Sequence, residues 1–417
     1  MNTFLTDGTK TNPYIDYDKL QSTTIDLLRF PLAIMVIFIH MLPPVVSVDG
    51  ADFPVLSGSG ILNITEITLS YVIPFIAVPC FFLISGYLFF ANFQKWSFEG
   101  YKSKLRSRIK TLVLPYILWN LVPFLIVLGK MTFRVVVRGK PADELISMLS
   151  KDIWHIFYDT YHWDAGVSWL GEKLYLAGPF DLPLWFLRDL IVVTLFTPVI
   201  YFMIRKFKIY FIALLALAFV SGVWILLPGF GITAFFFFSL GTYMALNKIN
   251  IVQLVHKYKY LIVPLFLLQL CLKVYFYGGN TTISPSIAMP LIYFCTFFIC
   301  FGVFFAFYVA SYCALKFKAR PNKLLVSSCF FIYALHDLYM PGIGRLLDTV
   351  RSYTAKLIPI DNAWGELLAY LLIPFLTAAV CILILQGLRR IAPRFAAVIS
   401  GNRSLPNPLV RKPDLSA

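Results

Sequence analysis

Long apolar runs alternate along the chain with short segments that hold most of the charged residues. Ten of these runs approach or reach the roughly 20 residues that a helix needs to cross the hydrocarbon core of a bilayer. The pattern therefore predicts ten membrane-spanning helices. They are expected at 24–42, 66–91, 111–128, 183–204, 209–227, 231–246, 260–277, 289–313, 324–347 and 364–388.

Composition supports this interpretation, because 59% of the residues are hydrophobic and only 14% are charged. Soluble domains carry about 25% charged residues, so this chain has too few to cover a water-facing surface. The first apolar run is followed by Pro43 and Pro44 instead of a small-residue cleavage site, so we expect it to remain as a helix. The predicted fold class is an all-α integral membrane protein, with about ten transmembrane helices in one bundle.

The net charge of +15 sorts by connecting segment, so it gives no single patch for nucleic acid. With the N-terminus inside, the inner segments hold 24 Lys and Arg and the outer segments hold eight. Positive residues collect on the cytoplasmic side of membrane proteins, so both termini are predicted to be cytoplasmic. The only long connection, 129–182, is then outside, and 143–158 within it has the pattern of a short amphipathic surface helix.

We expect three parts: a cytoplasmic segment 1–23, a ten-helix membrane domain 24–390, and a cytoplasmic tail 391–417. The seven cysteines lie in or beside apolar runs, and none has a CxxC partner. The pattern favours small buried side chains over disulfides, and no metal site is predicted.

The first predicted helix carries two ionisable side chains, Arg29 and His40. Such residues inside a membrane helix are costly and are functional candidates by default. Eleven residues make about three turns, which places the two on nearly the same side and about 16 Å apart. The alternatives are that Arg29 pairs with Asp26 or extends to the inner surface, and that His40 is a hydrogen-bonded interfacial residue. Thr23 and Asp26 also have the spacing of a capping box, which favours a helix start there.

A basic run precedes the third predicted helix and includes Lys104, Arg106 and Arg108. Cations clustered at the inner face suit a phosphate-bearing ligand, although ordinary positive-inside topology explains them equally well. The polar residue Asn120 follows within the helix.

Further polar and aromatic residues mark the later segments. The fourth predicted helix begins at Pro183 and carries Trp185, and its adjacent Arg188 and Asp189 point to different faces, which predicts different partners for them. The ninth helix carries His336 beside Asp337. Each of these pairs could simply hold helices together.

The outer loop contains Trp163 and Trp169. With Trp185 they are candidates for an acceptor platform, since flat apolar rings pack on the C–H faces of sugars. The alternative is an interfacial aromatic belt.

In this order the motifs resemble the acyltransferase type 3 family of polytopic bacterial membrane acyltransferases, over roughly residues 22–390. The matching segments are Arg29…His40, Phe81-Phe82-x-x-Ser85-Gly86, Pro115-Tyr116-x-x-Trp119-Asn120, Trp185-Phe186-Leu187 and Tyr333-x-x-His336.

The resemblance implies transfer of an acyl group, most often acetyl from acetyl-CoA, across the inner membrane onto a surface or secreted glycan. It implies Arg29 and His40 as a functional pair and Arg108 as a donor-binding residue, with Lys104 or Arg106 as alternatives. Acyl-CoA would be a co-substrate, with no resident cofactor, and the acceptor would be a glycan or a lipid-linked sugar.

The residues fit such a reaction in outline. His40 is expected to act either as general base or as a transient acyl carrier, with His336 as a second catalytic candidate. Asn120, Ser85 and Tyr333 are candidates for stabilising the oxyanion.

A secondary transporter, or a flippase for lipid-linked sugar, would also place charges inside the membrane. However, the two halves of the chain show no similarity and no matching broken helices.

Overall fold

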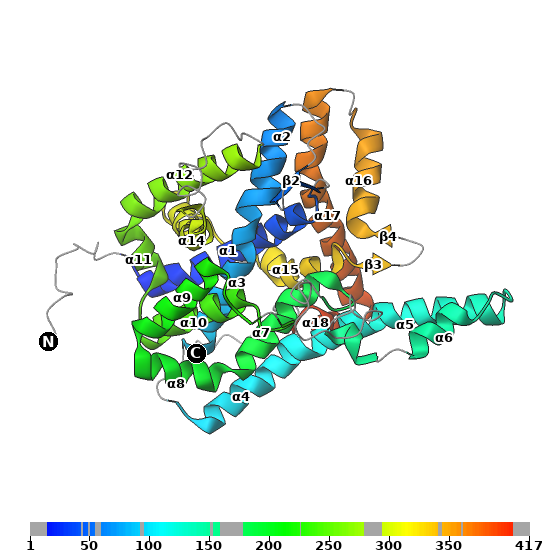
Figure 1. Ribbon diagram of the computed structural model, residues 1–417, viewed down its shortest axis with the longest axis horizontal. Helices are drawn as coiled ribbons and strands as arrows, with labels where there is room; N and C mark the ends of the chain where they lie inside the picture. Colours follow the sequence, from blue (N-terminus) through cyan, green and yellow to red (C-terminus); the bar gives the residue numbers. More distant parts are fainter. Residues whose placement is uncertain are drawn as a thin grey trace, which may run out of the picture.

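The computed structural model describes residues 15–42, 45–48, 51–54, 60–91, 96–150, 153–158, 178–225, 227–278, 294–340, 344–359 and 362–402. Within these ranges the chain is a helical bundle with two small antiparallel hairpins, which confirms the all-α fold class (Figure 1).

The first half of the chain supplies the elements from α1 to the short 3₁₀ turn η4. They are α1 (Tyr17–Ile39), β1 (Val45–Val48), β2 (Ala51–Pro54), α2 (Gly60–Glu66), η1 (Ile67–Val72), η2 (Ile73–Ile76), α3 (Ala77–Phe90), α4 (Phe98–Arg108), η3 (Ile109–Val113), α5 (Leu114–Val136), α6 (Asp143–Ser150) and η4 (Ile153–Phe157).

The second half begins at the 3₁₀ turn η7. Its elements are η7 (Leu182–Leu184), α7 (Trp185–Leu195), α8 (Thr197–Phe207), α9 (Ile209–Ser221), α10 (Ile232–Leu246), α11 (Ile251–Lys257), α12 (Lys259–Tyr277), α14 (Phe298–Lys316), α15 (Lys323–Leu335), β3 (Tyr339–Met340), β4 (Gly344–Arg345), α16 (Leu346–Leu357), α17 (Ala363–Ile391) and α18 (Pro393–Ile399).

Six helices in the described part of the chain are long and apolar enough to cross a membrane, or up to eight if each of two bent pairs counts as one span. The bent pairs are α7 with α8 and α10 with α11. Two of the ten predicted runs correspond to shorter apolar helices, α9 and α15. A multi-pass membrane protein is therefore supported, but the number ten is not confirmed.

The first helix begins earlier than the sequence pattern suggests. Asp16 caps it by accepting a hydrogen bond from the backbone N–H of Lys19 at 3.0 Å. The capping box predicted at Thr23 and Asp26 is wrong, because both residues lie inside α1. A polar first turn outside the apolar run explains the difference, since hydrophobic pattern marks the buried part of a helix and not its start.

The predicted helix 324–347 is also wrong in its second half. α15 ends at Leu335, and the chain then forms the β3–β4 hairpin before α16. Gly344 adopts a φ of +84°, a left-handed conformation that a glycine adopts without strain and that cannot continue an α-helix. The apolar composition of this segment hid a turn, and the turn places the residues after α15 beside the end of α1.

The outer loop is more helical than predicted at its start. α5 continues from Leu114 to Val136, so 129–136 extends the third predicted helix instead of forming a loop. α6 confirms a short helix within 143–158. Figure 1 shows α5 and α6 reaching beyond the rest of the bundle on one side.

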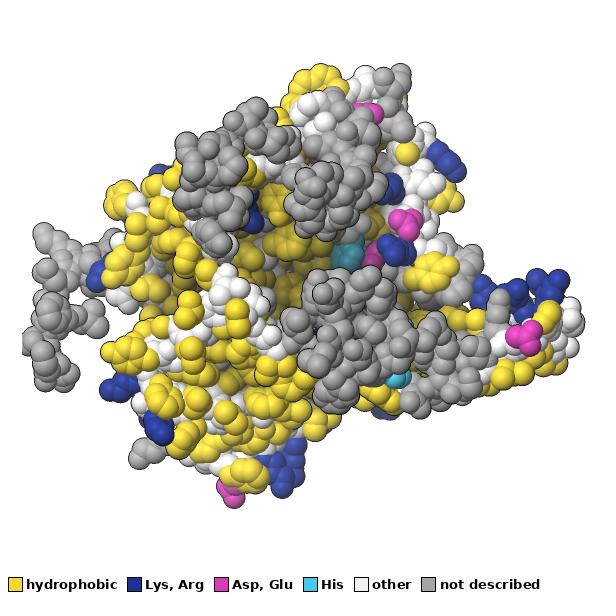
Figure 2. All heavy atoms as spheres, in the orientation of Figure 1, with side chains coloured by type: hydrophobic (Ala, Val, Ile, Leu, Met, Phe, Trp, Pro, Cys, Tyr) yellow, Lys and Arg dark blue, Asp and Glu magenta, His cyan; other side chains and the backbone are white. Residues whose placement is uncertain are grey.

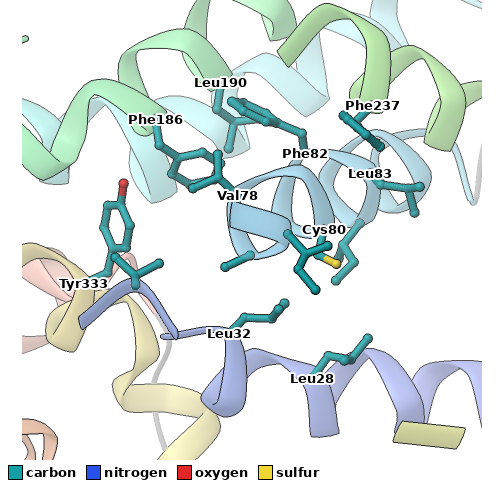
Figure 3. Packing of buried hydrophobic residues seen from close by; sticks show 14 of the residues in the cluster. Leu28, Leu32, Val78, Cys80, Phe82, Leu83, Phe186, Leu190, Phe237 and Tyr333 are labelled. Carbon is teal, nitrogen blue, oxygen red and sulfur yellow. The ribbon is translucent and has the colours of Figure 1, made fainter. Parts of the chain in front are cut away.

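The core lies where α3 packs against α1, α7 and α10 (Figure 3). Leu32 of α1 and Phe82 of α3 are fully buried there, and Phe186 of α7 lies against Phe82 with ring centroids 4.8 Å apart. This packing fixes the position of α1, which also contacts α15.

Two glycines let α3 and α10 approach closely. A Cβ at Gly86 would collide with the carbonyl oxygen of Phe238, and one at Gly241 would collide with that of Leu83. Small residues at helix crossings allow backbones to come together in this way.

Gly241→Ala is expected to destabilise the protein by about 1–3 kcal/mol, because backbone atoms would have to separate. Gly387→Ala in α17 is the matched control, since its Cβ would meet nothing within 4 Å. Thermal unfolding of detergent-purified protein should show a lower midpoint for Gly241→Ala only. Equal midpoints for the two variants would show that the α3–α10 crossing can relax.

Part of the predicted cytoplasmic tail packs on the bundle. α18 contacts α5 and α17, and the indole N–H of Trp119 donates to the carbonyl of Ile399 at 2.9 Å. The residues from 393 to 399 therefore belong structurally to the helical domain.

Candidate active site

The end of α1 brings His40 against a carboxylate. His40 is the C-cap residue of α1, and its Nδ1 lies 3.1 Å from Oδ2 of Asp337. Its side chain is 20% exposed, whereas that of Asp337 is 3% exposed. A carboxylate at Nδ1 fixes the ring orientation and the tautomer, which leaves Nε2 as the basic nitrogen.

His336 lies beside this pair at the C-terminal end of α15. Its ring centroid is 4.9 Å from that of His40, with the rings edge to face. Its Nδ1 lies 3.0 Å from the carbonyl of Ile332 and 2.9 Å from that of Tyr333. Carbonyl oxygens only accept, so Nδ1 carries a proton and a neutral His336 presents an unprotonated Nε2. That Nε2 is buried with no hydrogen-bond partner among the described residues.

Asp337 joins the two histidines to the hairpin. Nη1 of Arg345 on β4 lies 3.5 Å from Oδ1 of Asp337, and Arg345 is 46% exposed on its side chain. The sequence marked Asp337 only as a neighbour of His336, and it gave no role to Arg345. The available signal was a carboxylate at the end of an apolar run, but its pairing with His40 depends on the turn after α15.

A second carboxyl group, Asp181, lies just before η7 and is 1% exposed. Its backbone N–H donates to the side-chain oxygen of Asn120 at 2.9 Å. η7 packs against α15, and the hydroxyl of Tyr333 donates to the carbonyl of Pro183. Burial raises the pKa of the Asp181 carboxyl well above its usual range, and the nearby Asp337 raises it further. Sequence reasoning missed this residue, because a lone Asp at the end of a long loop carries no pattern.

Asn120 is fully buried on α5, and both ends of its amide are engaged. Its nitrogen donates to the carbonyl of Tyr116 at 2.8 Å while its oxygen holds Asp181. This arrangement favours a positioning role for Asn120 over direct contact with a substrate.

The predicted donor residues fall into two groups. Arg29 pairs with Asp26 at 3.0 Å, which is the local alternative that the sequence allowed. Lys104 and Arg108 lie one turn apart on α4 and are half-buried, whereas Arg106 is exposed. Arg108 stacks over the ring of Phe89 at 5.8 Å.

The aromatic residues are only partly placed. Trp163 and Trp169 lie outside the described residues. Trp185 is half-buried at the start of α7, directly after η7, and packs against the core. Arg188 and Asp189 contact each other with Nη2 and Oδ1 3.0 Å apart, which the sequence did not predict. Each also has the separate partner that was expected: Nη1 of Arg188 donates to the carbonyl of Tyr158 at 2.8 Å, and Asp189 accepts from the backbone N–H groups of Gly229 and Gly231.

Figure 2 shows a histidine side chain beside acidic and basic side chains, at the edge of a recess lined by hydrophobic side chains. Ionisable groups of both signs gathered beside an apolar recess are typical of a functional site. In the described residues no group of three or more His, Cys, Asp or Glu could hold a metal ion. The arrangement instead provides two imidazole nitrogens and two carboxyl groups for proton transfer.

The described residues thus form a multi-pass helical bundle with a carboxylate–histidine pair at the end of a spanning helix. The chain belongs to the acyltransferase domain family, whose pattern it matches over residues 23–386. This confirms the resemblance seen in the sequence motifs.

Among individual proteins, it is similar to the succinoglycan biosynthesis protein ExoH of Rhizobium meliloti (strain 1021). The two are 28% identical over 243 residues, which covers 56% of this chain and 56% of the relative. The chain therefore aligns with about half of that relative's length. No solved structure matches it.

Proposed function

We propose that this protein is a membrane O-acyltransferase that moves an acetyl group from acetyl-CoA onto a sugar hydroxyl of a surface or secreted glycan. Membership of the acyltransferase domain family supports the reaction class. The relative ExoH is named for succinoglycan biosynthesis, which supports a polysaccharide or its lipid-linked precursor as acceptor.

The observation that carries the proposal is the contact between Asp337 and Nδ1 of His40. In this reaction Nε2 of His40 takes the proton of the acceptor hydroxyl as its oxygen attacks the thioester carbon. Asp337 stabilises the resulting imidazolium. When the tetrahedral intermediate collapses, the C–S bond breaks and the coenzyme A sulfur takes the proton from His40. The acceptor leaves as an ester, and His40 returns to its neutral form.

Lys104 and Arg108 of α4 are the proposed site for the coenzyme A phosphates. Like charges spaced four residues apart on a helix repel each other, and Lys104 and Arg108 have no acidic partner among the described residues. A phosphate group would relieve that repulsion through charge-assisted hydrogen bonds. Arg29, about 16 Å from His40 along α1, would then lie along the path of the pantetheine arm.

Arg108→Ala is expected to raise the Michaelis constant for acetyl-CoA about tenfold or more, because an ionic hydrogen bond to phosphate contributes about 1.5–3 kcal/mol. The turnover number should change little, since Arg108 does not reach the reacting atoms. Arg106→Ala is the matched control on the exposed face of α4. Equal Michaelis constants for both variants and the wild type would place the phosphate site elsewhere.

We further propose that the protein lies in the inner membrane with both termini cytoplasmic. Counted over the ten predicted spans, the inner segments hold 24 Lys and Arg and the outer segments eight, which supports this orientation. It places α4 on the side where coenzyme A is made and His40 toward the opposite side, where a surface glycan is assembled.

The test compares glycan from cells with and without the gene by mass spectrometry, together with acetyl-CoA turnover by the purified protein. An acetyl increment that depends on the gene, and slow acetyl-CoA hydrolysis in detergent, are expected. A transporter or flippase would change glycan export without hydrolysing acetyl-CoA, and that result would overturn the proposal.

A further inference from the structure

The reaction proposed above generates a negative charge that the histidine pair cannot stabilise. As the hydroxyl oxygen attacks the thioester, the carbonyl oxygen becomes an oxyanion. A hydrogen-bond donor already positioned to stabilise that oxyanion often makes a large contribution to catalysis. His40 accepts a proton in this step, and Asp337 is negative. A separate hydrogen-bond donor is therefore required close to His40.

The donors suggested by sequence are already used or lie elsewhere. The Asn120 amide donates to the carbonyl of Tyr116, and the Tyr333 hydroxyl donates to the carbonyl of Pro183. Ser85 lies two residues before Tyr87, whose hydroxyl accepts from Gln21 near the start of α1. Ser85 is thus toward the opposite end of α1 from His40.

Asp181 is the buried polar group that remains. Both of its carboxyl oxygens are inaccessible and have no hydrogen-bond partner among the described residues. A buried carboxyl group without a hydrogen-bond partner destabilises the fold even when it is neutral, so its retention needs a reason. Nε2 of His336 is similarly buried without a hydrogen-bond partner among the described residues, and Oδ1 of Asp337 is buried with only the 3.5 Å ion pair to Arg345. These unsatisfied atoms lie around the end of α15, where a polar substrate group would satisfy them.

The location of Asp181 is fixed by several contacts. Asn120 holds its backbone N–H, and two residues later the carbonyl of Pro183 is held by Tyr333. Tyr333 is one turn before His336 on α15, with their rings 6.3 Å apart. These contacts tie the Asp181 segment to the helix end that carries His336 and Asp337.

We propose that Asp181, in its protonated form, donates a hydrogen bond to the acyl carbonyl oxygen and stabilises the oxyanion. This inference rests on the proposed acyltransferase function and assigns to it a further catalytic residue. An ionised Asp181 would repel the oxyanion, so the group must be neutral. Its full burial and the negative Asp337 nearby both disfavour the charged form. A protonated carboxyl group has one O–H to donate, and no described group in the protein accepts it.

The proposal predicts opposite effects on activity and stability. Asp181→Val removes the donor together with an unsatisfied polar group, so the thermal midpoint should stay level or rise while the turnover number falls about 10²–10³-fold. The Michaelis constant for acetyl-CoA should be unchanged, because the oxyanion exists only in the transition state. A residue with a merely structural role would lose stability first.

Asp181→Asn is the conservative variant, because its amide is neutral and still donates. It should keep turnover within about tenfold of the wild type, well above Asp181→Val. Asp189→Asn is the matched control, a carboxyl group of similar burial that is instead paired with Arg188. Its activity should follow its stability, with no separate loss of turnover.

Three results would overturn the assignment while leaving the acyltransferase function intact. Normal turnover in Asp181→Val would show that the group is not needed. Equal inactivity of Asp181→Asn and Asp181→Val in folded protein would show that a carboxylate, and not a neutral donor, is required. A loss confined to the Michaelis constant would indicate ground-state binding. Failure of the proposed function itself would appear differently, as absence of acyl transfer in the wild type.

Discussion

His40→Ala is expected to abolish glycan acylation while the protein still inserts, accumulates and binds acetyl-CoA. His40 offers the only imidazole in the described residues whose Nδ1 is held by a carboxylate and whose ring is partly exposed. Removing a general base typically lowers a rate about 10²–10⁴-fold. Binding should persist because Arg108 of the proposed phosphate site lies over Phe89. Tyr87, two residues before Phe89, bonds Gln21 near the start of α1, which is the end opposite His40. Acyl transfer to glycan and acetyl-CoA affinity, measured on the same preparation, separate the two effects.

The matched control is His256→Ala on α11. His256 is also a partly buried membrane-domain histidine, but it bonds the hydroxyl of Ser311 at 2.9 Å, and in the described part of the chain it has no hydrogen bond or ring contact with His40, His336 or Asp337. Its acylation should remain near that of the wild type. His336→Ala is expected to reduce acylation less than His40→Ala, because a neutral His336 contributes an acceptor and not a charge-paired base. If His336→Ala is inactive and His40→Ala is not, the base belongs on α15.

The sequence was sufficient to find both histidines. An imidazole or a carboxylate within an apolar run is unusual enough to be noticed one residue at a time. What the sequence could not supply was the pairing. It placed His336 and Asp337 inside a helix continuing to 347, where consecutive residues face in different directions and cannot both approach α1.

The turn after Leu335 changes that geometry. Since Asp337 leaves the helix, its carboxylate can contact His40 while the His336 ring stays packed under the helix end. A local break of this kind depends on tertiary contacts with α1 and the β3–β4 hairpin, which periodicity does not report. The burial of Asp181 could not be predicted for a related reason, because it results from the packing of η7 on α15.

The number of membrane-spanning helices was also beyond what the sequence pattern could predict. Apolar runs identify residues that avoid water, but they do not say whether each run is one straight helix. Residues 67–76 form a π-helical segment followed by a 3₁₀ turn instead of an α-helix. Pro74 lies in that 3₁₀ turn and has no N–H to continue the α-helical hydrogen bonds. α7 and α8 bend by 61° at Phe196, just before Pro198. Thus the bundle class follows from composition, whereas the count of spans does not.

Asp337→Asn is the second variant with a large expected effect, and it tests the dyad without changing its shape. Asparagine matches aspartate in size, so His40 should stay in place. However, the amide is neutral and cannot stabilise the imidazolium that forms when His40 takes a proton. If its NH₂ group faces Nδ1, it also favours the tautomer with a protonated Nε2, which is no longer a base. In the serine-protease triad the corresponding change lowers turnover by about 10⁴. We expect a fall of about 10²–10⁴ here.

The fold should tolerate Asp337→Asn, because the other partner of Asp337 is Arg345, whose side chain is 46% exposed and remains hydrated without the ion pair. The thermal midpoint is therefore expected to stay close to that of the wild type while turnover falls. Asp348→Asn, an exposed carboxylate in the first turn of α16, is the matched control and should change neither quantity. Asp337→Asn and His40→Ala remove members of one unit, so the double variant should be about as inactive as His40→Ala alone. Losses that multiply instead would show that Asp337 acts independently of His40, through Arg345 and the hairpin.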